Sequence, residues 1–135
     1  MTPRYLLDTN ICIAYKKRQP GVPERIDALP AGQAAMSVIT WGELMLGVEK
    51  SQHRTRSLEI LARVREIIPV IGVDENVGTR YGAIRGELEK AGRTIGPNDL
   101  WIAAHAQTLG VALVTNNTGE FARVSGLTLE DWTTP

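Results

Sequence analysis

Three carboxylates, Asp8, Glu43 and Asp99, stand beside the predicted starts of helices. Asp8 directly follows the apolar run 5–7, which suits a short buried strand. Parallel strands place such junctions at one edge of a sheet, so we expect the three side chains to meet in space. Two carboxylates about 4 Å apart repel by about 4 kcal/mol at an effective dielectric of roughly 20, so the cluster must take up a proton or hold a cation.

A cluster that offers only oxygen ligands selects Mg²⁺ or Mn²⁺. An ion held in this way can activate water and stabilise the leaving oxygen of a phosphodiester. Zinc is not expected, because no set of His and Cys residues has the spacing of zinc ligands. We expect His105 to be an ordinary helix-face residue that packs near Trp101.

Helix capping is the simpler explanation for each acid taken singly. Asp8 or Thr9 can cap the helix that follows, and Thr40 with Glu43 has the S/T-x-x-E spacing of a capping box. Asp99 lies in the first turn of an apolar, buried helix, where a carboxylate is costly unless it caps, pairs or binds a metal. The coincidence of three such junctions favours one shared site over three separate caps.

Strands and helices alternate along the chain and position these acids. Strands are predicted over residues 5–7, 34–39, 70–73, 111–115 and 127–129. Helices are predicted over residues 11–17, 24–29, 40–48, 58–68, 75–91 and 97–109, and residues 116–121 are expected to form a polar loop. This alternation predicts an α/β fold with a parallel sheet, in a single domain that spans residues 1–135.

The composition is that of an ordinary soluble protein. Of the 135 residues, 43% are hydrophobic, and 15 Lys and Arg balance 15 Asp and Glu. We therefore do not expect a protein that binds nucleic acid by charge alone, although an enzyme with an acidic metal site remains compatible with this balance. No membrane helix or export signal is visible. The single cysteine, Cys12, is typical of a reducing, cytoplasmic setting.

Four stretches together resemble one known family. They are Leu6-Leu7-Asp8-Thr9-Asn10, the segment 37–44 (SVITWGEL), the segment 96–106 (GPNDLWIAAHA), and the segments 114–121 (VTNNTGEF) and 126–132. In this order and at this total length, the chain resembles a PIN-domain protein of the VapC toxin type. The resemblance covers essentially the whole chain and is most specific in the segment 96–106.

The resemblance implies a three-layer PIN-like fold, with helices around a parallel sheet, and a cytoplasmic Mg²⁺-dependent endoribonuclease in which Mn²⁺ can substitute. It implies Asp8 and Asp99 as the principal metal ligands, with Glu43 completing the acidic site. Structured RNA, such as tRNA or rRNA, is the implied substrate. The implied partners are a second copy of the chain and a VapB-type antitoxin, for which the segment 44–68 offers apolar helical surface.

The chain departs from the family at the fourth acid. Many PIN domains have an acid in the loop after the last main strand, where this chain has Asn116 and Asn117. The nearest acid is Glu120, which is the remaining candidate for a further metal ligand. Thr9 and Asn10 join the two asparagines as expected polar residues of the active site.

Basic residues in and after the long helix that leads to Asp99 are candidates for holding the RNA backbone. They are Arg80, Arg85, Lys90 and Arg93. A solvated helix face with internal ion pairs explains any one of them equally well.

Two other functions are weighed against the nuclease. An aspartyl-phosphate phosphatase or receiver domain would use Asp8 as a nucleophile. It lacks support, because Asn10 stands where such phosphatases need a second acid and no later strand ends in a lysine. A non-catalytic binding module of the same fold is the second alternative, motivated by the missing fourth acid.

Overall fold

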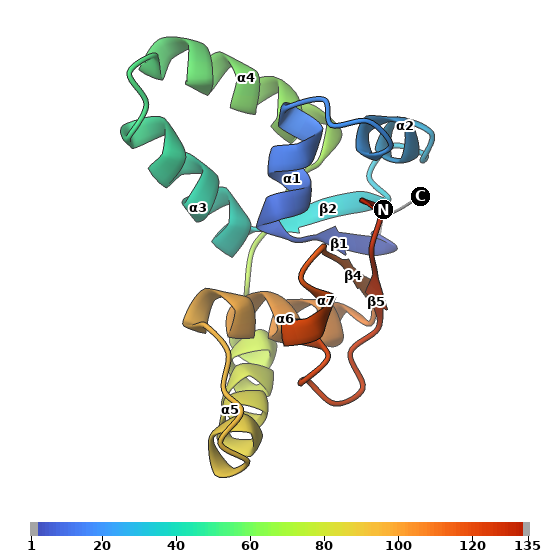
Figure 1. Cartoon of the computed structure of the whole chain (residues 1–135), viewed down its shortest axis with the longest axis vertical. Helices are drawn as coiled ribbons and strands as arrows, with labels where there is room; N and C mark the ends of the chain where they lie inside the picture. The colour runs from blue at the N-terminus through green and yellow to red at the C-terminus, as the bar shows by residue number, and fades with distance from the viewer. Residues whose placement is uncertain (1–2, 134–135) are drawn as a thin grey trace.

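A parallel sheet lies at the centre of the computed structural model, which describes residues 3–133 (Figure 1). Within that range the sheet has five strands in the order β3-β2-β1-β4-β5. The strands are β1 (Tyr5–Leu7), β2 (Ala34–Ser37), β3 (Val70–Ile71), β4 (Ala112–Val114) and β5 (Leu129–Glu130), and every pairing is parallel. β1 is the central strand, with Leu6 in register with Ala35 on one side and Leu113 on the other.

Helices cover both faces of the sheet. They are α1 (Thr9–Lys16), α2 (Val22–Asp27), α3 (Val38–Glu49), α4 (Arg54–Ile67), α5 (Glu75–Lys90), α6 (Pro97–Leu109) and α7 (Thr118–Phe121). Successive side chains of a strand point to opposite faces. Leu7 accordingly joins the core under α1–α4, and Leu6 joins the core under α5 and α6. The expected α/β fold with a helix layer on each side of the sheet is confirmed.

Local sequence signals account for the ends of two long helices. The Asp74 side chain caps α5 by accepting a hydrogen bond of 3.1 Å from the Val77 backbone N–H. Gly110 ends α6 in the left-handed conformation, with φ of 70°, which a residue with a Cβ adopts only at a cost. Both features agree with the sequence prediction. In residues 3–133 no helix has the length and apolar character needed to cross a membrane.

The junction between β2 and α3 differs from the prediction. Val38 and Ile39 belong to the helix and not to the strand, and Ser37 is the N-cap, accepting a hydrogen bond of 3.1 Å from the Ile39 N–H. The predicted capping box of Thr40 and Glu43 is therefore wrong, because both residues lie inside α3. Two β-branched residues favoured a strand, but the capping serine overrode that local preference.

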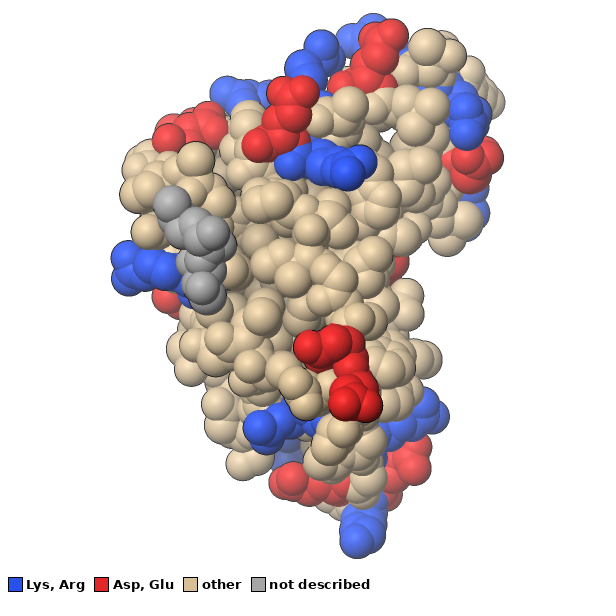
Figure 2. All heavy atoms as spheres, turned by 180° about the vertical axis from the view of Figure 1, so that it is seen from behind, with Lys and Arg blue, Asp and Glu red and all other residues tan. Residues whose placement is uncertain are grey.

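Smaller differences lie near the ends of the sheet. β3 and β5 have two residues each, shorter than or shifted from the predicted segments 70–73 and 127–129. The expected loop 116–121 contains the short helix α7. On the face seen in Figure 2, Lys and Arg gather mainly toward the two ends of the molecule, and the outline narrows between the end with α3 and α4 and the end with α5 and α6.

Candidate active site

Asp8 lies at the centre of the acidic site, at the carboxyl end of the central strand. It is 4% exposed, and its Oδ1 accepts a hydrogen bond of 2.8 Å from the Thr9 N–H, so it caps α1. Its Oδ2 accepts a second bond of 2.8 Å from the Thr115 hydroxyl, which follows β4. Burial raises the pKa of Asp8, although the bonds from Thr115 and Thr9 oppose the shift. Capping alone would not require this second, buried bond.

Glu43 reaches the same site from the second turn of α3. Its Oε1 accepts a hydrogen bond of 2.6 Å from the Thr9 hydroxyl, whose oxygen also lies 3.1 Å from Oγ1 of Thr40. A hydroxyl has one proton, so Thr9 donates to the carboxylate and accepts from Thr40. Thr40 is fully buried. This chain of two hydroxyls fixes the orientation of the Glu43 carboxylate.

Asp99 completes the trio from the first turn of α6, and Glu120 joins it from α7. The pKa of Asp99 is raised to about 6, first by burial and then by the negative charges of Asp8, Glu120 and Glu43. A side-chain interaction of Asp99 with Glu120 adds to the same shift, so these two carboxyl groups lie close together. Glu120 Oε1 also lies 3.4 Å from the Gly96 backbone nitrogen. The structure therefore brings all four predicted acids into one electrostatic cluster.

The asparagines that were predicted as polar residues of the site lie beside these acids. Asn10 Nδ2 donates to Oδ1 of Asn116 at 2.5 Å, and Asn117 Nδ2 donates to Oε2 of Glu120 at 2.5 Å. The Asn117 backbone N–H donates to the Thr115 hydroxyl at 2.9 Å. Asn117 thus orients Glu120, while among residues 3–133 the side chain of Asn116 bonds Asn10 and none of the acids.

The chemistry of this donor set fits a hard divalent cation. All four acids offer oxygen, and among residues 3–133 no Lys or Arg forms an ion pair with any of them. In the same range, however, no three side chains of His, Cys, Asp or Glu are close enough to form a ready metal cage. Glu43, Asp99 and Glu120 are only partly buried, so they can move inward when an ion replaces their repulsion with attraction.

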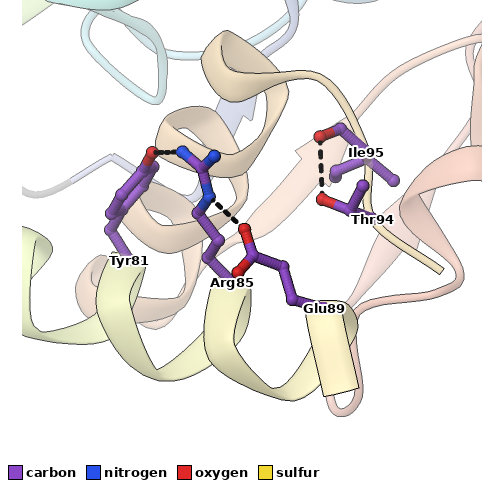
Figure 3. A network of polar contacts seen from close by, with 5 residues as sticks. All are labelled: Tyr81, Arg85, Glu89, Thr94 and Ile95. Atoms are coloured by element: carbon purple, nitrogen blue, oxygen red, sulfur yellow. Dashed lines mark hydrogen bonds and ion pairs between the residues drawn. The ribbon is translucent and has the colours of Figure 1, made fainter. Parts of the chain in front are cut away.

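The predicted RNA-contacting residues do not behave alike. The Arg85 guanidinium donates to Glu89 at 2.7 Å and to the Tyr81 hydroxyl at 2.6 Å (Figure 3), which is the internal pairing of a solvated helix face. Arg80, Lys90 and Arg93 are exposed and form no ion pair with another described residue. Arg85 is therefore the least available of the four for a phosphate.

Three polar residues of the site region were missed or misjudged from the sequence. Thr115 directly follows the apolar run 111–114 and precedes two asparagines. It therefore stands after β4 as Asp8 stands after β1. Thr40 was assigned to a capping box and proves to support Thr9. His105 was expected to be an ordinary helix-face residue, and the hydrogen bond of 2.8 Å between its ring and Ser37 was not foreseen.

Comparison with known proteins gives consistent matches along the chain. The family model of the PIN domain matches residues 5–127. The chain is 45% identical over 130 residues to the tRNA(fMet)-specific endonuclease VapC of Shigella flexneri, covering 96% of this chain and 98% of that protein. It is 40% identical over 131 residues to ribonuclease VapC1 of Haemophilus influenzae strain R2866, with the same two shares covered.

Solved structures agree with this picture. The DNA-bound VapBC complex of Salmonella typhimurium matches with a TM-score of 0.91 at 37% identity, over 96% of this chain and 98% of that one. VapBC2 of Rickettsia felis, bound to a DNA fragment from its promoter, matches with a TM-score of 0.88 at 36% identity, over 95% of this chain and 98% of that one.

Proposed function

The chain belongs to the PIN domain family, and within it to the VapC ribonucleases, and on this premise we propose that it is the toxin of a toxin–antitoxin pair that cleaves structured RNA with the help of Mg²⁺. It is an endoribonuclease, a hydrolase of phosphodiester bonds. The observation that carries the metal proposal is the gathering of four acids with no Lys or Arg of residues 3–133 in an ion pair with them, and the raised pKa of Asp99 is consistent with their mutual repulsion.

Asp8, Asp99, Glu43 and Glu120 would hold the ion. A divalent cation bound there activates water and stabilises negative charge that develops on the phosphodiester. The hydroxyl chain from Thr40 through Thr9 keeps the Glu43 carboxylate aimed at the site. Thr115 does the same for Asp8, and Asn117 for Glu120. The protein's contribution is thus a set of oriented oxygens held before substrate arrives.

The products should carry a 5′-phosphate and a 3′-hydroxyl, because attack by water does not use the RNA 2′-OH. We propose tRNA as the first substrate to test, since the relative from Shigella flexneri is named for tRNA(fMet). Arg80, Lys90 and Arg93 are the candidates for phosphate contacts, which position the RNA without selecting its sequence.

The proposed partners are a VapB-type antitoxin and a second copy of the chain. Support for the antitoxin comes from the relatives of known structure, which are VapBC complexes. Leu46 and Ile67, in α3 and α4, are 54% and 45% exposed, within the segment 44–68 that was predicted to bind a partner helix. Sedimentation at micromolar concentrations would test the homodimer, and finding only monomer would contradict it.

The alternative of a non-catalytic module of the same fold was motivated by the missing fourth acid. Glu120 weakens that motive, because α7 brings it to Asp99. The deciding experiment incubates the purified chain with tRNA and with an unstructured RNA, with Mg²⁺ or EDTA, and maps the new 5′ ends. Cleavage of tRNA that needs Mg²⁺ and disappears in Asp99→Asn supports the proposal. A folded wild type that leaves every RNA intact supports the binding module.

A test in cells complements this assay. Expression of the chain alone should arrest growth, and Asp8→Ala or Asp99→Ala should abolish the arrest. Normal toxicity from a soluble Asp99→Ala protein would remove the nuclease mechanism.

A further inference from the structure

His105 is a fully buried histidine that the acidic site does not use. It lies in α6 with 1% of its surface exposed, and its Nδ1 is 2.8 Å from Oγ of Ser37, which is fully buried. Buried polar side chains are costly unless they are hydrogen-bonded, so each of these two residues needs the other as its partner. Ser37 is the residue at which β2 ends and α3 begins.

The proton positions around His105 follow from its neighbours. Burial lowers the pKa of His105 and favours the neutral ring, while Asp74 and the Gly72 backbone oppose this shift, so Gly72 presents its carbonyl as an acceptor to a ring N–H. Nδ1 is already used by Ser37, which leaves the proton for Gly72 on Nε2. Ser37 then donates its hydroxyl proton to Nδ1 and accepts from the Ile39 N–H at 3.1 Å. Each polar group has a partner when the ring is neutral.

This arrangement joins the two helices that carry acids. Asp99 is on α6, six residues before His105, and Glu43 is on α3, six residues after Ser37. Among residues 3–133, the bond from His105 to Ser37 is the one side-chain hydrogen bond between α6 and the start of α3. A shift or fraying of the first turn of α3 would move Thr40 and Glu43 away from Thr9.

We propose that His105 is a positioning residue, which holds the first turn of α3 through Ser37 and so keeps Glu43 in place opposite Asp99. The inference rests on the proposed nuclease function for its activity assay, and the hydrogen bond itself can be tested without that function. Partners behind metal ligands change metal affinity or activity by about 10–100-fold when they are removed. We expect an effect of that size on kcat, with KM for RNA nearly unchanged.

Two substitutions of His105 separate its hydrogen bonds. In His105→Asn the side-chain amide occupies the place of Nδ1 and can still bond Ser37, whereas in His105→Gln it reaches the place of Nε2 and can bond only Gly72. We expect Asn to retain most of the cleavage rate and Gln to lose about tenfold or more. Ser37→Ala, which removes only a hydroxyl, should match the Gln variant and add little to it in the double variant.

Mn²⁺ affinity measured by calorimetry without RNA should follow the same order. Melting temperatures are measured alongside. If His105 had a merely structural role, both His105 variants would be less stable than the wild type, but the two would have the same kcat and the same Mn²⁺ affinity. Equal activity of the Asn and Gln variants, or full additivity of Gln with Ser37→Ala, would overturn the inference.

The ring tautomer gives an answer that does not depend on activity. Nitrogen NMR of the metal-free protein should show His105 neutral, with Nδ1 unprotonated, and His53, which is exposed, serves as the internal reference. In Ser37→Ala the Nδ1 signal should shift. An Nδ1 signal that does not change in Ser37→Ala would overturn the inference whether or not the protein cleaves RNA. A wild type with the expected tautomer and no nuclease activity would refute the proposed function alone.

Discussion

Mutual repulsion among the acids is the dominant feature at the scale of single residues. In the metal-free protein, the negative charges of Asp8, Glu120 and Glu43 repel the Asp99 carboxylate. Asp99→Asn removes one charge and should therefore melt at or above the wild-type temperature in EDTA, while losing RNA cleavage. If Asp99 were only a helix cap, the same change would cost about 0.5–1 kcal/mol.

Mn²⁺ should raise the melting temperature of the wild type much more than that of Asp99→Asn. At a free Mn²⁺ concentration of about ten to a hundred times the dissociation constant, binding adds about 1.4–2.7 kcal/mol to wild-type stability. For a domain of this size that is on the order of 3–10 °C in Tm, and Asp99→Asn should show much less. Glu59→Gln, which removes an exposed charge on α4, is the matched control and should rise like the wild type. A wild type indifferent to Mn²⁺ would contradict the metal site.

Glu120 should behave as the fourth acid. Its contact with Asp99 predicts that Glu120→Gln lowers the pKa of Asp99 toward its ordinary value and weakens Mn²⁺ binding. Asn116→Ala is the comparison, because within the described part of the chain the Asn116 side chain bonds Asn10 and no acid. Calorimetry with Mn²⁺ should show a larger loss for Glu120→Gln. The reverse order would assign the fourth position to the asparagine.

At the scale of elements, a helix cap outside the acidic site provides a contrast. Asp74→Ala removes the bond to the Val77 N–H and should lower stability by about 0.5–2 kcal/mol. Asp74→Asn can still cap and should recover most of this loss. Chemical denaturation measures both. Neither variant should change the rise in Tm with Mn²⁺, and a change would mean that α5 is coupled to the site.

Elements with strong, independent signals were predictable from the sequence. Asp74, Pro97 and Gly110 mark helix ends by side-chain or backbone chemistry that acts locally, and the structure agrees at each. The start of α3 was not predictable in the same way. Val38 and Ile39 suit a strand as well as a helix, and the choice depends on Ser37 being buried against His105, 68 residues away.

The residues of the site also differ in how far they could be predicted from the sequence. The location of Asp8, Glu43 and Asp99 near one another followed from where parallel strands end. Glu120 could only be named as the nearest acid, because its approach to Asp99 depends on α7, a single turn within an apparent loop. The support from Thr115 and Thr40 depends on contacts over more than 30 residues, which no local pattern records.

At the scale of the whole molecule, the cluster makes stability depend on pH. The pKa of Asp99 in the folded protein, about 6, is raised above its ordinary value of 3.8. Its contribution to stability is therefore fully present below the unfolded pKa and is lost as the pH rises through about 6. Because Asp99 is partly exposed, we expect a loss of no more than about 2 kcal/mol.

The difference in stability between wild type and Asp99→Asn isolates this effect from all other titrating groups. In EDTA, the wild type should lose stability relative to the variant from about pH 3 to about pH 7, most steeply between the unfolded and the folded pKa of Asp99, as measured by denaturation at each pH. Saturating Mn²⁺ should reverse the trend, because the ion binds the ionised form. A difference that does not vary with pH would mean that Asp99 is not held near the other acids.

The strand order has a consequence for synthesis on the ribosome. β1 is synthesised first and lies in the middle of the sheet. It cannot pair on both sides until β4, whose last residue is Val114, has been synthesised. Asp8 likewise lacks its hydrogen bond from Thr115 until that residue has been synthesised, and Asp99 lacks its neighbouring acid until Glu120 has been synthesised. A nascent chain that carries Asp8 and Glu43 therefore lacks the other two acids of the cluster until residue 120 has emerged from the ribosome.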